Sequence, residues 1–222
     1  YLDGALAAYY DTVRMGSVFA SHEKVERGIV MMRIPYRGDD GKLVEMNGFM
    51  KRQDVSLGYL AYTPRSVIEQ AFKLLNAPYG WGGAGQEQDC LAFLQEAFAT
   101  VGIILPRNSS EQAEVGYLLG EFSGKTPEAV KFDTIARDAA GGITTLKLDG
   151  HIMLYLGIYG LKPYAIHATY GYGEKMALGE ADRVLNRVVV SDLSLGNGSK
   201  KGSLLERLSS IRLIADQDIK GK

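Results

Sequence analysis

The chain changes its residue pattern twice, and this order constrains the fold more than any other feature. Short β-type runs separated by turns extend to about residue 62, apolar residues at helical spacing follow, and β-type runs return after Gly124. Helices followed by strands within one unit indicate an α+β fold. We therefore expect two domains, at residues 1–62 and 63–222.

The first domain is expected to be a small β-barrel. A turn signal at residues 38–41 separates two β-type runs, 25–36 and 42–46, and a further short strand follows at 48–51. Four or five such strands suit a barrel that is too small to bury a large core alone. Residues 1–15 carry apolar residues at helical spacing and predict a short helix or turn.

The second domain is expected to begin with helices. Thr63 and Pro64 form a helix start, and the apolar face that follows ends before Pro78. Further helices are predicted at residues 90–101 and from Ser109, where a capping-box pattern lies. After Gly124 the pattern predicts strands at 151–159, 164–170, 184–190 and 210–215.

Cys90 is the chain's single cysteine, and it follows a glycine-rich loop at residues 80–85. A thiol in the first turn of a helix meets unpaired N–H groups and the positive end of the dipole, which favour the thiolate. Free cysteines are also commonly buried and inert, and residue type alone favours that alternative. The preceding Asp89 is a good N-cap for the same helix. The position at a helix start nevertheless points to a nucleophile.

Two histidines lie downstream of Cys90, each on a predicted strand. His151 opens one strand and His167 lies in the next, joined by a turn around residues 160–163. A single strand histidine is usually structural, but adjacent strands bring both to one site. One would serve as the base and the other would fix its tautomer. A tight turn would not place the two directly opposite each other.

Composition and spacing exclude several other functions. The net charge of −1 gives no indication of binding to nucleic acid or an anionic membrane surface. No Cys/His cluster has zinc spacing, and no apolar run is long enough to span a membrane. The GxGxxG match at residues 80–85 follows a helix and is separated from the next helix, unlike a dinucleotide site. The start lacks both a signal peptide and an initiating Met, so we expect a processed or trimmed product.

Five segments in order resemble the NlpC/P60 family of cysteine peptidases, and the similarity covers about residues 64–222. They are residues 78–83 (PYGWGG), 89–90 (DC), 102–112 (GIILPRNSSEQ), 150–157 (GHIMLYLG) and 166–167 (IH). Residues 48–57 (GFMKRQDVSL) end a β unit that resembles the bacterial SH3 domain often found before this catalytic domain.

The resemblance implies a papain-like α+β fold preceded by an SH3-like barrel. It implies hydrolysis of cell-wall peptides at the bond between γ-D-glutamate and a diamino acid, on stem peptides or released muropeptides, outside the cytoplasm. Cys90 would be the nucleophile, His151 the general base and His167 its orienting group. Asp89, Ser109, Tyr79, Trp81 and Leu91 would line the substrate groove, with Asp89 helping to hold a free peptide amine. No metal and no organic cofactor is implied.

The residue after the cysteine departs from the family pattern. The family usually has Ser there, and this chain has Leu91. Leucine has no hydroxyl to offer to a substrate, so preference at the amine end of the peptide is expected to differ while the thiol chemistry survives. Two other classes stay open. One is a wall-binding module without catalysis, which the presence of Cys90, His151 and His167 disfavours. The other is an amidase or acyltransferase on the same scaffold.

Overall fold

The computed structural model describes residues 1–215, apart from the side chains of residues 21–26, 84 and 86. It divides into two compact units, Tyr1–Leu60 and Ala61–Lys222. Each unit has its own sheet. Within the described residues, none of the helices has the length and apolar character needed to cross a bilayer.

The first unit holds an antiparallel sheet of three strands in the order β1-β2-β3. These strands are β1 (Ser21–Glu26), β2 (Ile29–Arg37) and β3 (Leu43–Lys51), and a 3-10 helix, η1 (Arg52–Asp54), follows. The predicted turn at 38–41 joins β2 to β3, which pair from Arg37↔Leu43 onward. The strands predicted at 42–46 and 48–51 are thus one continuous strand, and the described residues of the first unit contain three strands and not four or five.

Residues 1–15, predicted to be a short helix or turn, contain the turn and not the helix. The segment forms turns, and the Asp3 carboxylate accepts hydrogen bonds from the N–H groups of Ala7 and Ala8, at 3.1 and 2.6 Å. Leu6 has a φ of 56°, outside the helical region. A local side-chain acceptor therefore satisfies the backbone in place of helical bonds.

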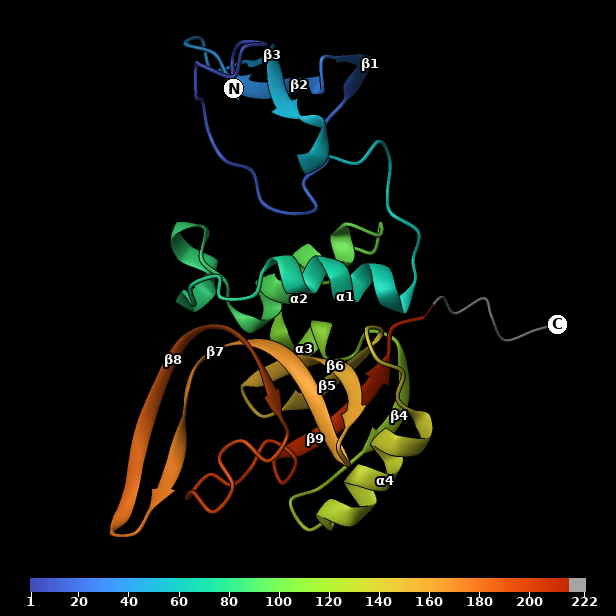
Figure 1. Ribbon diagram of the computed structural model, residues 1–222, viewed down its shortest axis with the longest axis vertical. Helices are drawn as coiled ribbons and strands as arrows, with labels where there is room; N and C mark the ends of the chain where they lie inside the picture. The colour runs from blue at the N-terminus through green and yellow to red at the C-terminus, as the bar shows by residue number, and fades with distance from the viewer. Residues whose placement is uncertain (216–222) are drawn as a thin grey trace, which may run out of the picture. The chain divides into compact units, whose positions relative to one another are not determined.

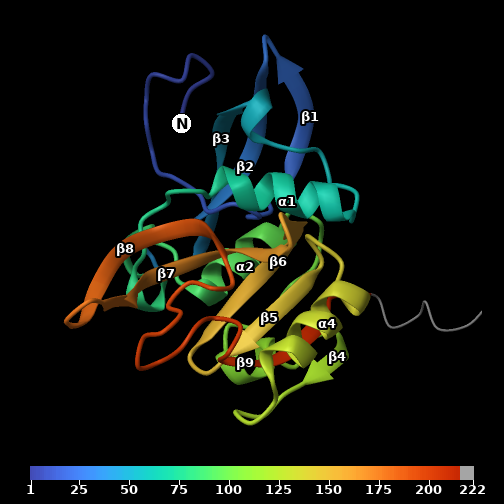
Figure 2. The same ribbon diagram turned by 60° about the horizontal axis from the view of Figure 1, so that its bottom comes forward.

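The second unit combines helices with a six-stranded sheet in the order β4-β9-β5-β6-β7-β8. In Figures 1 and 2, α1 and α2 lie together, and β7 and β8 form a long hairpin. The helices are α1 (Pro64–Lys73), η2 (Trp81–Gln86), α2 (Cys90–Ala99), α3 (Ser109–Gln112) and α4 (Glu128–Asp138). The strands are β4 (Tyr117–Glu121), β5 (Thr144–Leu148), β6 (His151–Tyr159), β7 (Lys162–Met176), β8 (Gly179–Asp192) and β9 (Leu208–Leu213).

The expectation of β structure directly after Gly124 is wrong, because α4 lies there. Only Lys131 and Ile135 of this helix are buried, so its apolar stripe is too narrow to give a helical period in the sequence. The strands predicted near His151, His167 and Val188 are all present, and β7 and β8 extend well beyond the predicted ends.

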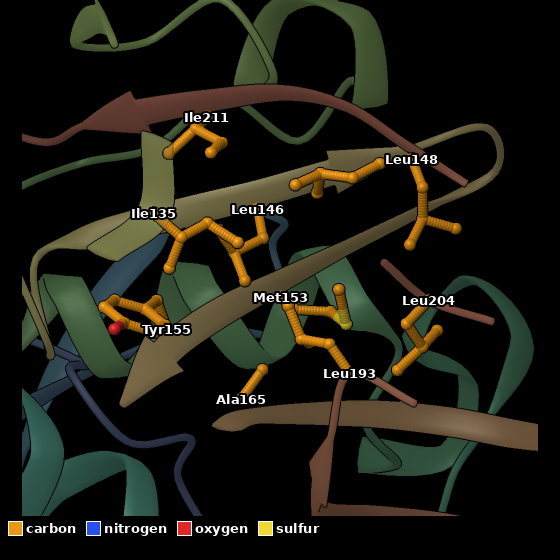
Figure 3. Packing of buried hydrophobic residues seen from close by; sticks show 10 residues of the cluster. Ile135, Leu146, Leu148, Met153, Tyr155, Ala165, Leu193, Leu204 and Ile211 are labelled. Carbon is orange, nitrogen blue, oxygen red and sulfur yellow. The ribbon is translucent and has the colours of Figure 1, made fainter. Parts of the chain in front are cut away.

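The core of the second unit places β6 at the centre of the sheet. Residues 152–155 of β6 are all buried, so both faces of this strand are covered. On one face, β5, β6 and β7 contribute Leu146, Leu148, Met153, Tyr155 and Ala165 to a cluster with Ile135 of α4 (Figure 3). Helix α2 also packs against β6 and β7. A rigid, doubly covered strand therefore carries His151 at its first residue.

Candidate active site

Helix α2 begins at Cys90 because Asp89 caps it. One Asp89 carboxylate oxygen, Oδ1, accepts hydrogen bonds from Leu91 N at 3.0 Å and Ala92 N at 2.7 Å. These are two of the N–H groups that a helix leaves unpaired at its start. The predicted cap and the predicted helix start are confirmed.

The segment before the cysteine is fixed to the edge of the sheet. Asn76 N donates to Val188 O at 3.0 Å, and Tyr79 N donates to Asn186 O at 3.1 Å, so this stretch extends the sheet beside β8. Gly80 N then donates to Gln88 O at 3.0 Å, which closes the η2 loop just before Cys90. Gly82 and Gly83 adopt φ of 73° and 70°, a left-handed conformation that favours glycine.

The two histidines meet across the β6–β7 pair. His151 Nε2 lies 2.8 Å from His167 Nδ1, and the ring centroids are 4.9 Å apart. The register pairs Leu154 with Ile166, so His151 and His167 are diagonal neighbours rather than a directly opposite pair. This agrees with the prediction from the length of the turn.

The thiol of Cys90 lies beside the start of β6. The N–H of Ile152, the residue after His151, is within hydrogen-bonding reach of the Cys90 sulfur. The turn that starts α2 and the first residues of β6 therefore meet at the thiol. Cys90 thus lies beside the start of the strand that carries His151, whose partner is His167.

The electrostatics of Cys90 correct the expectation of a resident thiolate. Burial raises the pKa of the Cys90 thiol, and the nearby Asp89 carboxylate raises it further, whereas the Ile152 N–H and Lys147 lower it. Burial is the largest of these effects, so the thiol stays protonated near neutral pH. The helix start alone does not outweigh removal of the thiol from water.

Both histidines are held neutral. Burial lowers the pKa of His151 well below its ordinary value, and the neighbouring His167, Arg207 and Lys147 lower it further. Burial also lowers the pKa of His167 to about 4. Near neutral pH the resting site is therefore a thiol beside two uncharged imidazoles, in which His151 is free to accept a proton.

The residues predicted to line a groove occupy different settings. Tyr79 is half-buried, and burial followed by the proximity of Cys90 and Asp89 raises the pKa of its phenol. The Trp81 side chain is 86% exposed, Ser109 is exposed, and Leu91 is half-buried. Tyr79 is therefore close enough to Cys90 to feel its charge, and Trp81 is available to an incoming ligand.

Asp89 is fully engaged by protein groups. Its Oδ1 caps α2, and its Oδ2 forms an ion pair with Arg107. Gln112, which is buried, donates to Leu91 O at 3.3 Å and Pro106 O at 2.8 Å, and so ties α3 to the start of α2. The segment from residue 106 to 112 therefore supports the cysteine turn.

The capping-box interpretation of Ser109 is wrong by one residue. Asn108 is the N-cap of α3, and its side chain accepts from Ser110 N at 2.9 Å. Ser109 is the first residue of the helix, so its hydroxyl is not used as the cap. Either residue suits an N-cap, and sequence spacing alone favoured the one with Gln112 three positions later.

Three further residues at the site were not singled out from the sequence. Arg107 pairs with Asp89, Tyr170 stacks its ring 6.4 Å from that of Tyr79, and Ser191 Oγ lies 3.0 Å from His167 Nε2. In the sequence analysis, Arg107 appeared only as a member of the segment 102–112, without a role of its own. Tyr170 and Ser191 gave no signal, because strand register brings them to the site. Among residues 1–215, no three His, Cys, Asp or Glu side chains are grouped for metal binding.

Comparison with known proteins finds similarity within the second unit. Residues 76–176 match the model of the NlpC/P60 family, and this range includes Cys90, His151 and His167. The bifunctional muramidase/DL-endopeptidase CwlT of Bacillus subtilis (strain 168) is 32% identical over 94 residues, which cover 41% of this chain and 26% of that protein.

Two solved structures share the fold. An NlpC/P60 endopeptidase from Photobacterium damselae subsp. piscicida has a TM-score of 0.68 at 18% identity, over 90% of this chain and 48% of that one. An NlpC/P60 family protein from Bacillus cereus ATCC 10987 has a TM-score of 0.54 at 14% identity, over 89% and 54%. The chain spans about half of these structures and about a quarter of the Bacillus subtilis protein.

Proposed function

We propose that the chain, whose residues 76–176 form an NlpC/P60 family domain, is a cysteine peptidase that hydrolyses peptidoglycan peptides. One observation carries the proposal. The thiol of Cys90, at the start of a capped helix, lies beside the strand whose His151 is joined to His167 at 2.8 Å. A nucleophile, a base and an orienting group in that order are what acyl transfer to sulfur requires.

In the proposed reaction, His151 Nδ1 takes the proton of the Cys90 thiol as the sulfur attacks the amide carbonyl. The Cys90 N–H stabilises the oxyanion that forms. The tetrahedral intermediate then collapses, the C–N bond breaks, and the leaving amine takes the proton from His151. Water, with His151 again as base, hydrolyses the thioester and restores the thiol. Throughout, His167 Nδ1 accepts the hydrogen bond from His151 Nε2–H.

The raised thiol pKa and the lowered imidazole pKa fit proton transfer during attack better than a preformed ion pair. Burial disfavours the charged form of both groups, so the pair is neutral until the substrate arrives. The charge that develops on His151 is then stabilised by its hydrogen bond to His167. His167 is therefore an essential part of the proposed mechanism.

The proposed substrate bond lies between γ-D-glutamate and a diamino acid, in wall stem peptides or released muropeptides. The names of two relatives, a DL-endopeptidase and an endopeptidase, support a peptide substrate. Tyr79 and Trp81, with Ser109 and Leu91, are proposed to contact the peptide. Asp89 is proposed to act mainly through the turn that it caps, because protein groups already occupy both of its oxygens. The proposed location is outside the cytoplasm, which cell-wall hydrolases among the relatives support.

The first unit is proposed to be an SH3-like module, within domains at residues 1–62 and 63–222. Its support is the sheet β1-β2-β3 and the short helix η1 that follows β3. An experimentally determined structure of the full chain tests this proposal. Closure of these strands into a barrel is the expected result, and an open sheet would contradict it.

Digestion of defined muropeptides, with mass analysis of the products, tests the proposed function. We expect products that begin at the diamino acid. Release of the intact stem peptide from the sugar would show an amidase instead, and transfer to an added amine would show an acyltransferase. Binding without any product would show a wall-binding module. A Cys90→Ala sample treated in parallel controls for contaminating hydrolases.

A further inference from the structure

Ser191 extends the line of hydrogen-bonded side chains by one member. It lies on β8, opposite Ala165 of β7, so His167 is its diagonal neighbour on the same face of the sheet. Its hydroxyl oxygen is 3.0 Å from His167 Nε2. The two nitrogens of the buried His167 therefore have one partner each, His151 on one side and Ser191 on the other.

The direction of these hydrogen bonds decides whether His151 can work as a base. To accept a proton at Nδ1, a neutral His151 must carry its hydrogen on Nε2 and donate it to His167 Nδ1. His167 then has its own hydrogen on Nε2, and its partner there among the described residues is the Ser191 hydroxyl, which must accept. The reverse arrangement would put a hydrogen on His151 Nδ1 and block proton transfer from the thiol.

A cavity beside Ser191 allows this direction. It has a volume of about 420 Å³ and is lined by Tyr172, Glu174, Ser191, Ser194 and Asn197, among others. A hydroxyl that accepts from a buried imidazole must direct its own hydrogen elsewhere, and the cavity that Ser191 helps to line offers space for it.

We propose that Ser191 is a positioning residue that holds His167 in its Nε2–H tautomer and thereby keeps His151 Nδ1 free to accept the thiol proton. Ser191 lies outside residues 76–176, the range that matches the family model. The inference rests on the proposed function for its catalytic consequence. The tautomer itself is a property of the folded protein that is measurable without any substrate.

Nitrogen-15 NMR of the imidazoles gives the direct test, since the chain has three histidines to assign. In the wild-type protein we expect His167 to be protonated at Nε2 and not at Nδ1. In Ser191→Ala the Nε2–H population should fall, and in Ser191→Thr, which keeps the hydroxyl, it should be retained. A wild-type His167 protonated at Nδ1, or an unchanged tautomer in Ser191→Ala, would overturn the proposal.

Kinetics of peptide cleavage give the second test, with Ser194→Ala as the matched control. Ser194 lines the same cavity, but its hydroxyl bonds to Asp192 and not to a histidine. We expect Ser191→Ala to lower kcat by about tenfold or more at unchanged KM, while Ser191→Thr and Ser194→Ala stay near wild type. An equal loss in Ser194→Ala, or no loss in Ser191→Ala, would contradict the assignment.

A double-mutant cycle separates positioning from mere packing. In a His167→Asn background the orienting group has no tautomer, so adding Ser191→Ala should cause no further loss of kcat. A further loss of the same size as in the wild-type background would overturn the proposal. If the wild-type chain cleaves no wall peptide at all, the proposed function fails, while the NMR comparison still decides the role of Ser191.

Discussion

His151 and His167 meet edge to face, with Nε2 of the first 2.8 Å from Nδ1 of the second and ring planes inclined by 69°. This contact uses Nε2 of His151, so Nδ1 is the nitrogen to which the proposed mechanism assigns the thiol proton. It also makes the base dependent on an acceptor that is buried and neutral. The proposed catalysis depends on this contact between His151 and His167.

Replacement of His167 by alanine should impair catalysis more than its replacement by asparagine. His167→Ala leaves His151 Nε2 without a partner, so kcat/KM should fall by on the order of 10² or more. In His167→Asn the amide oxygen can take the place of Nδ1, and activity should stay within about tenfold of wild type. Peptide cleavage rates with both variants check this. Equal losses would show that the orienting hydrogen bond is not what His167 supplies.

Alkylation of the thiol by a small reagent should keep accelerating into the alkaline range. Burial raises the pKa of Cys90 from its ordinary value of 9.0, so the thiolate fraction near neutral pH is small. The rate of alkylation of the folded protein by iodoacetamide should therefore keep rising above about pH 9. Because the chain has one cysteine, intact-mass analysis reports this site alone. A plateau already reached below neutral pH would contradict the neutral pair.

Stability should fall on mild acidification. The pKa of His167 is lowered from 6.5 to about 4, so between these values the unfolded chain binds the proton more strongly than the folded one. The stability present above pH 6.5 should decline towards pH 4, by about 3 kcal/mol for His167 alone. Burial of His151 acts in the same direction.

Urea unfolding at a series of pH values measures this effect. His167→Gln should flatten the dependence between about pH 6.5 and 4. The carboxylates with lowered pKa, such as Asp138 and Asp192, lose their contribution only below their ordinary value of 3.8, outside this window. A wild-type stability that stays flat across the window would contradict the burial of neutral histidines.

Asp89 should stabilise the protein mainly by capping the start of α2. Asp89→Ala removes two capping hydrogen bonds and the ion pair with Arg107, and should cost about 1–2 kcal/mol of unfolding free energy. Asp89→Asn keeps a capping oxygen and should cost less than about 1 kcal/mol. Urea titrations compare the two, with Arg107→Gln as control for the ion pair alone. Equal destabilisation by Ala and Asn would show that the cap contributes little.

Much of the second unit could be predicted from local signals. Thr63 and Pro64 start α1, Asp89 caps α2, and the apolar run from His151 forms the central strand. These signals are strong because each combines a cap or turn residue with a clear hydrophobic period. Helix α4 escaped prediction, since it buries only Lys131 and Ile135.

Some residues of the candidate site could likewise be predicted from the sequence, and others could not. The sequence singled out Cys90, His151 and His167, because cysteine and histidine have few roles in proteins and each of these residues has a distinctive local setting. Ser191 and Tyr170 escaped notice, because strand register and the docking of residue 79 beside β8 bring them there. The helix start that favours the Cys90 thiolate is visible in the sequence, whereas the burial that opposes it is not.

The most direct test of the central claim is the rate at which Cys90→Ala cleaves a wall tripeptide that contains the γ-D-glutamyl–diamino acid bond. The variant keeps the helix cap and both histidines but has no sulfur to form the thioester. We expect cleavage to fall by on the order of 10³ or more relative to wild type, with the unfolding midpoint in urea little changed. Cleavage by Cys90→Ala at a rate comparable to wild type would contradict the account.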